Sequence, residues 1–275
     1  MRKFPFATIL ATDERIVKAL SVDQEYMVSV ALPYHYDENP DKTYPVIYVL
    51  DGNWYFGMVV DMVRIMNTRA SFCNELPDAI IVGIGYPNGE TFEERSHQIG
   101  QRRMRDFTSV RDEGLEEWHH SMFPIEERMQ SGGADKFLEF IKDDLLPLIE
   151  SEYRVDATNR CLLGHSLGGL FALHTVFKHP ALFHKYVIVS PAEIYENEPW
   201  FTESAVSLPV RMYLSTGDLE LDWEENGRAR FHRLAQILES KLAGGTALVE
   251  QIFPHNTHCA VVAPAFQAGL VAVLP

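Results

Sequence analysis

The sequence has few cysteines, no long apolar run and no surplus of basic residues. Its three cysteines, Cys73, Cys161 and Cys259, are an odd number at wide spacing, which excludes a disulfide framework and a zinc-finger pattern. No apolar run reaches the roughly 18 residues that a membrane-spanning helix needs. Its 24 Lys and Arg are outnumbered by 39 Asp and Glu, and the resulting net charge of −15 repels a phosphate backbone. We therefore expect neither nucleic-acid binding nor a membrane span.

The 275 residues also contain no internal repeat, low-complexity tract or flexible linker, so we expect one domain over residues 1–275. The chain begins with Met1-Arg2-Lys3 and an apolar stretch to Ala11, which superficially resembles a signal peptide. That stretch is short, charged residues follow at once and no cleavage site is evident. We therefore expect a cytoplasmic protein.

Short β-branched runs alternate with longer helical stretches along the chain. Apolar residues recur at helical spacing in 134–151, 167–178 and 226–242. The run 26–32 alternates between apolar and polar residues, which predicts a half-exposed early strand. Continuous apolar runs, typical of a parallel sheet covered on both faces, are 46–50, 79–84, 161–163, 186–189, 210–214 and 247–253. The alternation predicts an α/β fold, a mostly parallel central sheet flanked by helices.

Residues 90–131 are polar and have no clear helical or strand period. Long loops in compact domains are usually functional, so we expect a lid-like insertion here. His119 and His120 are adjacent and lack the i, i+4 spacing of helical metal ligands. We therefore expect no metal site, although Glu116 and Glu117 are nearby.

The motif Gly164-His165-Ser166-Leu167-Gly168 matches the nucleophile-elbow pattern G-x-S-x-G. A predicted strand precedes it and a predicted helix follows it, which is the context that the elbow requires. Its two glycines permit a sharp turn that lifts the serine hydroxyl above the sheet. We predict that Ser166 is a nucleophile; the alternative is a serine that only caps the helix.

In hydrolases with this motif, an acid and then a histidine follow the serine along the chain. His255 and His258 lie in the loop after the last predicted strand, and we favour His258 as the general base because a helix entry follows it. Three carboxylates follow the preceding strand, at Asp218, Glu220 and Asp222. Glu220 comes three residues after a turn glycine, as the acid does in many such enzymes, so we rank it before Asp218.

A tetrahedral intermediate needs two amide donors for its oxyanion. The amide of Leu167, directly after the nucleophile, is the first candidate. The second is the amide of Asn53, in the turn after the strand that ends at Leu50. Gly52 permits an unusual backbone dihedral there; the alternative is a simple Asp-Gly turn.

With these motifs in order, the chain resembles the putative-esterase branch of the α/β-hydrolases over nearly its whole length. Within that branch it is most similar to the enterobactin-type (trilactone siderophore) esterases, to which esterase D is related. The resemblance implies Ser166 as nucleophile and His258 as base. It leaves the acid open, because some members work as a Ser–His dyad. The matching segments are 48–53, 102–108, 132–137, 164–171, 190–191, 217–220 and 257–258.

Three arginines, Arg102, Arg103 and Arg105, crowd into four positions of this acidic chain. A guanidinium presents a planar fork of donors suited to carboxylate, phenolate or catechol oxygens. A similar segment in the siderophore subgroup faces an anionic ligand, so the resemblance implies that Arg102 or Arg103 binds the substrate. The alternative is that they pair on a solvated surface with nearby acids, which are Glu93, Glu94 and Asp112.

The chain departs from the siderophore subgroup after Ser190-Pro191. That subgroup usually carries a tryptophan-rich stretch there, whereas residues 192–196 of this chain read Ala-Glu-Ile-Tyr-Glu. We expect a serine carboxylic-ester hydrolase that works through an acyl-enzyme and needs no cofactor. Its substrate would be a small-molecule ester, either a siderophore-like trilactone or another anionic ester. Alternatives are a small-acyl carboxylesterase or thioesterase, an acyltransferase with the same triad, and a non-catalytic binding protein.

Overall fold

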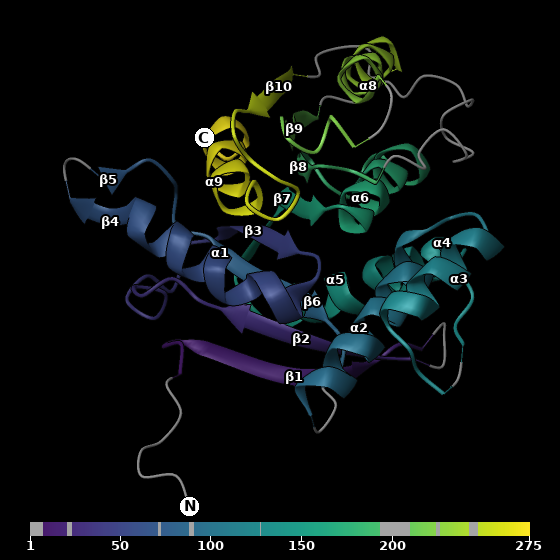
Figure 1. Cartoon of the computed structure of the whole chain (residues 1–275). Coiled ribbons are helices and arrows are strands. Elements are labelled where there is room, and N and C mark those ends of the chain that lie inside the picture. Colours follow the sequence, from purple (N-terminus) through teal and green to yellow (C-terminus); the bar gives the residue numbers. More distant parts are fainter. Residues whose placement is uncertain are drawn as a thin grey trace, which may run out of the picture.

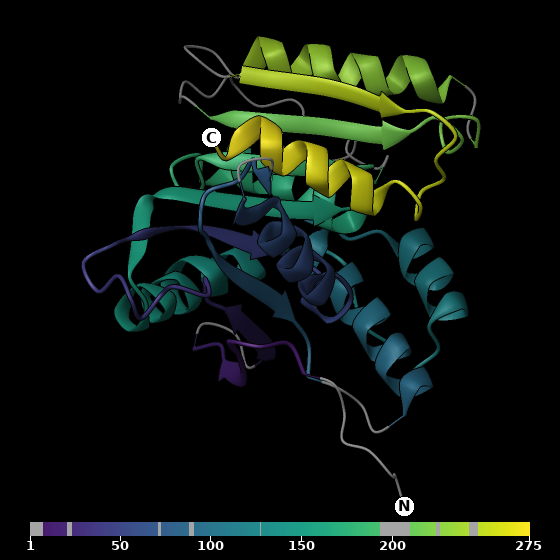
Figure 2. The same cartoon turned by 90° about the vertical axis from the view of Figure 1, so that its left-hand side faces the viewer.

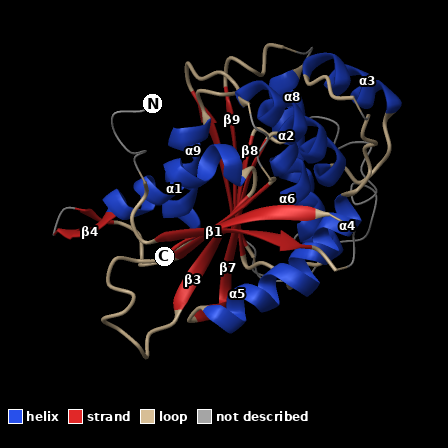
Figure 3. Ribbon diagram, turned by 90° about the horizontal axis from the view of Figure 1, so that it is seen from below, coloured by secondary structure: helices blue, strands red, loops and turns tan. Residues whose placement is uncertain are grey.

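The computed structural model describes residues 8–20, 24–70, 73–87, 91–126, 128–192, 210–223, 226–241 and 247–275. These residues form an eight-stranded sheet in the order β1-β2-β6-β3-β7-β8-β9-β10. All neighbours from β6 to β10 pair in parallel, and β2 pairs antiparallel with β1 and β6. Figure 2 shows β9 and β10 pointing the same way, and Figure 3 shows the strands fanned by the twist of the sheet. The strands are β1 (Thr12–Lys18), β2 (Glu25–Ala31), β3 (Tyr44–Val49), β6 (Ile80–Gly85), β7 (Val155–His165), β8 (Lys185–Val189), β9 (Arg211–Gly217) and β10 (Ala247–Phe253).

Helices cover both faces of this sheet, as Figure 1 shows. One face packs against α1 and α9, and the other against α2, α4, α5, α6 and α8. A small hairpin of β4 (Asn67–Ala70) and β5 (Cys73–Asn74) follows α1. None of the described helices is long and apolar enough to cross a membrane. The helices are α1 (Gly52–Met66), α2 (Phe92–Phe107), α3 (Glu113–Met122), α4 (Ala134–Glu139), the π-helical turn η1 (Phe140–Leu145), α5 (Leu146–Glu152), α6 (Leu167–Lys178), α8 (Gly227–Lys241) and α9 (Val262–Val273).

Strand β3 shows why the apolar runs form a buried sheet. Successive side chains of a strand point to opposite faces. Val46 and Tyr48 accordingly lie in the core under α6, while Ile47 and Val49 lie in the core under α1 and α9. Because both faces need apolar side chains, the run is continuous, and the predicted covered parallel sheet is confirmed.

Two local predictions were wrong. Strand β2 is not half-exposed, since every residue from Tyr26 to Ala31 is buried. Residues 92–107 and 113–122, expected to form an irregular loop, are helices, while the lid-like role of 90–131 stays a prediction. Helix α2 begins with a capping box between Thr91 and Glu94 and packs on α4 and α6. Its inner face contains Arg103 and Asp106 beside apolar residues, and these buried polar groups hide the helical period in the sequence.

Candidate active site

Ser166 occupies the sharp turn between β7 and α6. Its φ of 59° and ψ of −122° lie outside the regions that non-glycine residues ordinarily adopt. A Cβ on Gly164 would lie 2.2 Å from the carbonyl oxygen of Gly168, so only glycine fits where the strand meets the helix. Backbone strain of this kind costs about 1–3 kcal/mol and is concentrated at functional sites. The geometry is that of a nucleophile elbow.

His258 lies between β10 and α9 and is bound to the acid that the sequence ranked first. Its Nδ1 is 2.5 Å from Oε2 of Glu220. The other carboxylate oxygen, Oε1, accepts hydrogen bonds from Ser190 Oγ at 2.5 Å and the amide of Gly217 at 2.7 Å. Burial by itself would raise the pKa of Glu220, but the hydrogen bonds from His258, Ser190 and Gly217 outweigh it and lower this pKa. Glu220 is therefore ionised and has three hydrogen bonds, one of them to the imidazole of His258.

The imidazole of His258 lies beside the elbow. Its ring centroid is 4.4 Å from that of His165, the residue that precedes Ser166. The other candidate base, His255, is exposed and has a φ of 59°. Asp218, the second-ranked acid, accepts a hydrogen bond from the amide of Asn256 at 3.2 Å. Of the candidates weighed from the sequence, His258 and Glu220 are bonded to each other and lie beside the elbow.

The two candidate oxyanion donors lie at the N-termini of two helices. Leu167 is the first residue of α6 and Asn53 the second of α1, and the backbone N–H groups of a first helical turn point outward at the helix N-terminus. The side chain of Asn53 is locked to Tyr86: Nδ2 donates to its carbonyl at 2.9 Å, and Oδ1 accepts from its amide at 2.8 Å. These contacts fix the first turn of α1 against the end of β6.

The prediction that Gly52 supplies an unusual backbone dihedral in this turn was wrong. The left-handed residue of this turn is Asp51, with a φ of 53°, and Gly52 does not have a positive φ. Glycine is required at position 52 because a Cβ there would lie 2.8 Å from the amide nitrogen of Ile84. The turn thus depends on close approach to β6 rather than on glycine's dihedral freedom.

Arg103 does not lie on a solvated surface but is buried in an ion pair under the elbow. Its Nε and Nη2 donate to the two oxygens of Asp51 at 2.9 and 3.0 Å. The exposed fraction is 9% for the Arg103 side chain and 0% for Asp51. Asp51 thus binds two of the three guanidinium nitrogens, Nε and Nη2, and substrate binding by Arg103 stays a prediction. The alternative pairing of Arg103 with Glu93, Glu94 or Asp112 is wrong, since its partner is Asp51.

Arg105 and Arg102 have different environments on the same helix. Arg105 forms a two-pronged ion pair with Asp106, at 2.6 and 2.9 Å, and also binds Gln24. Arg102 is half-buried, and its Nη1 has no hydrogen-bond partner in the described part of the chain. Burial, followed by the charge of Arg105, lowers the pKa of Arg102. Of the three arginines, Arg102 is the one with a buried nitrogen that has no hydrogen-bond partner among the described residues.

Sequence reasoning missed three further residues around the base. Ser190 adopts a φ of 42° and bonds Glu220, although the only hint was its place in a matching Ser-Pro pair. Trp223 is 66% exposed, and its ring centroid lies 5.6 Å from that of His258. Tyr55 donates to or accepts from His165 Nδ1 at 3.0 Å. Residues 193–196, which align with the tryptophan-rich stretch of the siderophore subgroup, lie outside the described residues.

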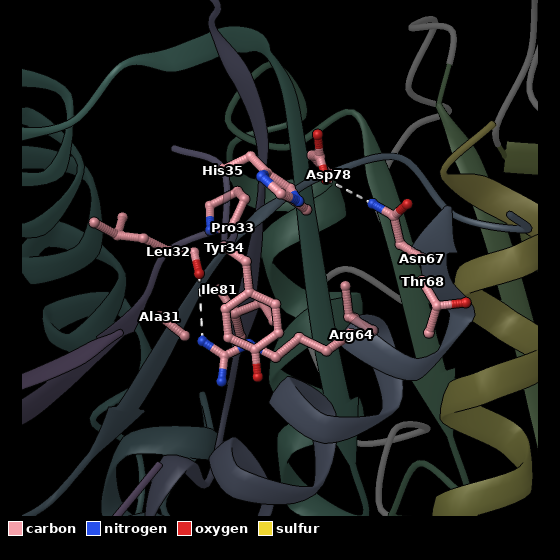
Figure 4. Close-up of a pocket in the computed structure, with 12 residues that line it drawn as sticks. Ala31, Leu32, Pro33, Tyr34, His35, Arg64, Asn67, Thr68, Asp78 and Ile81 are labelled. Atoms are coloured by element: carbon pink, nitrogen blue, oxygen red, sulfur yellow. Dashed lines mark hydrogen bonds between the residues drawn. The ribbon is translucent and has the colours of Figure 1, made fainter. Parts of the chain in front are cut away.

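Figure 4 shows a different pocket at the last turn of α1. There the guanidinium of Arg64 lies over the ring of Tyr34 and donates to the carbonyl of Leu32. Asn53 and Tyr55 lie on the first turn of the same helix, about 14–17 Å from Arg64 at 1.5 Å per residue. This pocket is therefore separate from the Ser166 site.

The role of the acid can be tested with two matched carboxylates. Glu220→Gln removes the charge that faces His258 and disturbs its tautomer, so we expect kcat to fall by about 10²–10⁴-fold. Asp218→Asn, two residues earlier, removes a charge but keeps the oxygen that accepts from the amide of Asn256, and should leave kcat within about threefold. Steady-state ester hydrolysis measures both. Equal activity of the two variants would mean that Glu220 is not the acid.

Comparisons with known proteins identify the family of the chain. The model of the Esterase family, described as "Putative esterase", matches residues 19–122 and 110–241. Ferri-bacillibactin esterase BesA of Bacillus subtilis is 34% identical over 253 residues, which cover 84% of this chain and 80% of BesA. The siderophore enterobactin esterase of Emericella nidulans is 31% identical over 187 residues, 66% of this chain and 58% of its own length.

A solved structure shares the whole fold. The BES protein of Bacillus cereus has a TM-score of 0.79 and 28% identity, and the match covers 99% of this chain and 98% of that chain. An IroE-like serine hydrolase from Shewanella oneidensis superposes with a TM-score of 0.74 at 22% identity, covering 94% and 79%, which supports the fold alone. The chain belongs to the putative-esterase family and is an ester hydrolase with the α/β-hydrolase fold.

Proposed function

We propose that the chain hydrolyses carboxylic esters through an acyl-enzyme on Ser166. His258 takes the hydroxyl proton while Oγ attacks the ester carbonyl, and the amides of Leu167 and Asn53 stabilise the oxyanion. Collapse breaks the C–O bond, and His258 gives its proton to the leaving alcohol. Water then loses a proton to His258 and attacks the acyl carbon. Collapse breaks the bond to Oγ, which takes the proton back from His258, and the free acid leaves. The observation that carries the proposal is the strained Ser166 beside the bonded pair of His258 and Glu220.

The carboxylate of Glu220 would hold the proton of His258 on Nδ1. The second ring nitrogen, Nε2, then presents its lone pair to the serine hydroxyl, as a general base must. The same negative charge stabilises the imidazolium that forms during attack. Ser190 and Gly217 support this role because their hydrogen bonds keep the carboxylate ionised and fixed in place.

We infer that the substrate is a siderophore-like ester that carries aromatic rings with anionic oxygens. The two relatives described above are named as siderophore esterases, one for ferri-bacillibactin and one for enterobactin. Arg102 offers a guanidinium donor without a partner in the described residues. The exposed rings of Trp223, beside His258, and Trp54, next to Asn53, offer surfaces on which a flat ring can stack.

Arg102→Met tests the recognition of anionic oxygens. Loss of a charge-assisted hydrogen bond should raise KM for a dihydroxybenzoyl ester about 10–100-fold, with kcat nearly unchanged. KM for a neutral benzoyl ester should stay within about threefold. Arg95→Met is the matched control, since it removes an exposed positive charge from the same helix. An equal rise of KM for both esters would contradict a role in charge recognition.

A substrate panel tests the ester class. The purified chain would be given a catecholate trilactone, short acyl p-nitrophenyl esters and acyl thioesters, each with and without an added alcohol acceptor. We expect the trilactone to have the largest kcat/KM and the product to be free acid. Fast turnover of short esters with no turnover of the trilactone would favour a small-acyl esterase. Transfer of the acyl group to the alcohol would favour an acyltransferase.

A further inference from the structure

His165 links the nucleophile elbow to the backbone of the general base. It is the last residue of β7 and is joined directly to Ser166. Its Nε2 lies 2.9 Å from the carbonyl oxygen of His258, and the two imidazole rings pack at a centroid distance of 4.4 Å. The ring of His165 therefore contacts both the backbone carbonyl and the imidazole ring of His258.

These contacts determine the tautomer of His165. A carbonyl oxygen can only accept a hydrogen bond, so Nε2 must carry the proton. In the neutral ring Nδ1 then has a lone pair, which accepts from the hydroxyl of Tyr55 at 3.0 Å. Burial above all, and then the charges of His258 and Arg103, lower the pKa of His165 to about 3. The ring stays neutral at the pH values at which an esterase works.

Tyr55 is itself held in place by two elements. It lies on the first turn of α1, two residues after Asn53, and its ring meets that of Phe266 on α9 edge-on at a centroid distance of 5.6 Å. Burial raises the pKa of its hydroxyl, so Tyr55 remains a donor. A chain of contacts thus runs from α1 through Tyr55 and His165 to the backbone of His258.

We propose that Tyr55 and His165 are positioning residues that set the place of His258 relative to Ser166. This inference rests on the proposed function, in which His258 takes the proton of Ser166. Glu220 fixes the imidazole from its Nδ1 side, while His165 fixes the loop that carries it. Because His165 adjoins the nucleophile, one hydrogen bond ties the base-bearing loop to the elbow. A base displaced by about 1 Å can lose 10²-fold in rate.

Two amide variants of His165 separate its two hydrogen bonds. The amide nitrogen of Gln reaches the position of Nε2, whereas that of Asn reaches only the position of Nδ1. We expect His165→Asn to lower kcat about 10²-fold with KM little changed, since the bond to the His258 carbonyl is lost. His165→Gln should recover activity to within about 10-fold of the original chain, because it keeps that bond. Equal kcat values for Asn and Gln, or a loss confined to KM, would overturn the inference.

Tyr55→Phe provides the mild variant, which removes one oxygen and keeps the ring packing on Phe266. We expect kcat to fall about fivefold at unchanged KM, with an equal fall in the rate at which a fluorophosphonate labels Ser166. If His165→Asn does not fold, Tyr55→Phe is the test of the inference. A kcat and a labelling rate equal to those of the unmodified chain in Tyr55→Phe would overturn it. The proposed function fails separately, if the unmodified chain hydrolyses no ester or if Ser166→Ala remains active.

Discussion

Replacing Ser166 by Ala is expected to lower kcat for a p-nitrophenyl ester by at least about 10⁴-fold, the scale seen when a triad nucleophile is removed. Only an oxygen at this position can form the acyl-enzyme, and the binding site and oxyanion donors that remain give little turnover without it. The hydroxyl is small and the turn is set by the backbone, so the fold should persist. Steady-state hydrolysis and circular dichroism measure the two effects.

Ser151→Ala is the matched control for this experiment. It removes an exposed hydroxyl at the end of α5, where Oγ donates to the carbonyl of Leu148. We expect no change in kcat from it. Substantial turnover by Ser166→Ala, with a fold unchanged by spectroscopy, would refute the assignment of Ser166 as nucleophile.

Arg103→Met is expected to destabilise the chain by about 3–5 kcal/mol, because it leaves the carboxylate of Asp51 buried without its partner. The carboxylate lies under the elbow: a Cβ on Gly168 would be 3.3 Å from Asp51 Oδ2. The pair also joins the turn before α1 to α2. For a domain of this size the loss corresponds to a fall in Tm of roughly 10 °C. Urea unfolding followed by fluorescence measures it.

The double variant Asp51→Asn with Arg103→Met distinguishes a buried pair from a substrate contact. Asn tolerates the left-handed backbone of position 51 and carries no charge. We expect the double variant to be more stable than Arg103→Met alone, because no isolated charge stays buried. A stable Arg103→Met with a raised KM would instead support the predicted role of Arg103 in substrate binding.

The sheet and the elbow could be predicted from sequence because each depends on a strong local pattern. Strands β3, β6 and β8 are continuous apolar runs, and the elbow needs glycines at fixed positions. Helix α2 could not be predicted. Its buried face includes Arg103, whose charge is compensated by Asp51, a residue 52 positions away in the sequence. Local hydrophobic periodicity carries no information about such a distant partner.

The sequence alone could not decide which carboxylate is the acid, for a similar reason. Three carboxylates within five residues have the same chemistry, and the choice among them depends on the shape of the turn after β9. In the fold, the amide of Gly217 and the hydroxyl of Ser190 hold one oxygen of Glu220 and direct the other to His258. The chain brings Ser190 to this turn from 30 residues away. The positioning role proposed for Tyr55 depends likewise on a contact across 110 residues.

The proposed function depends on Ser166 as the nucleophile and on its activation by His258. Labelling with a fluorophosphonate, followed by peptide mass spectrometry, identifies the modified residue without any assumption about the substrate. We expect a single adduct on Ser166, none in Ser166→Ala, and labelling slowed by about 10²-fold or more in His258→Ala, the scale of a lost general base. An adduct on another residue, or labelling of Ser166 at the original rate without His258, would contradict the proposed function.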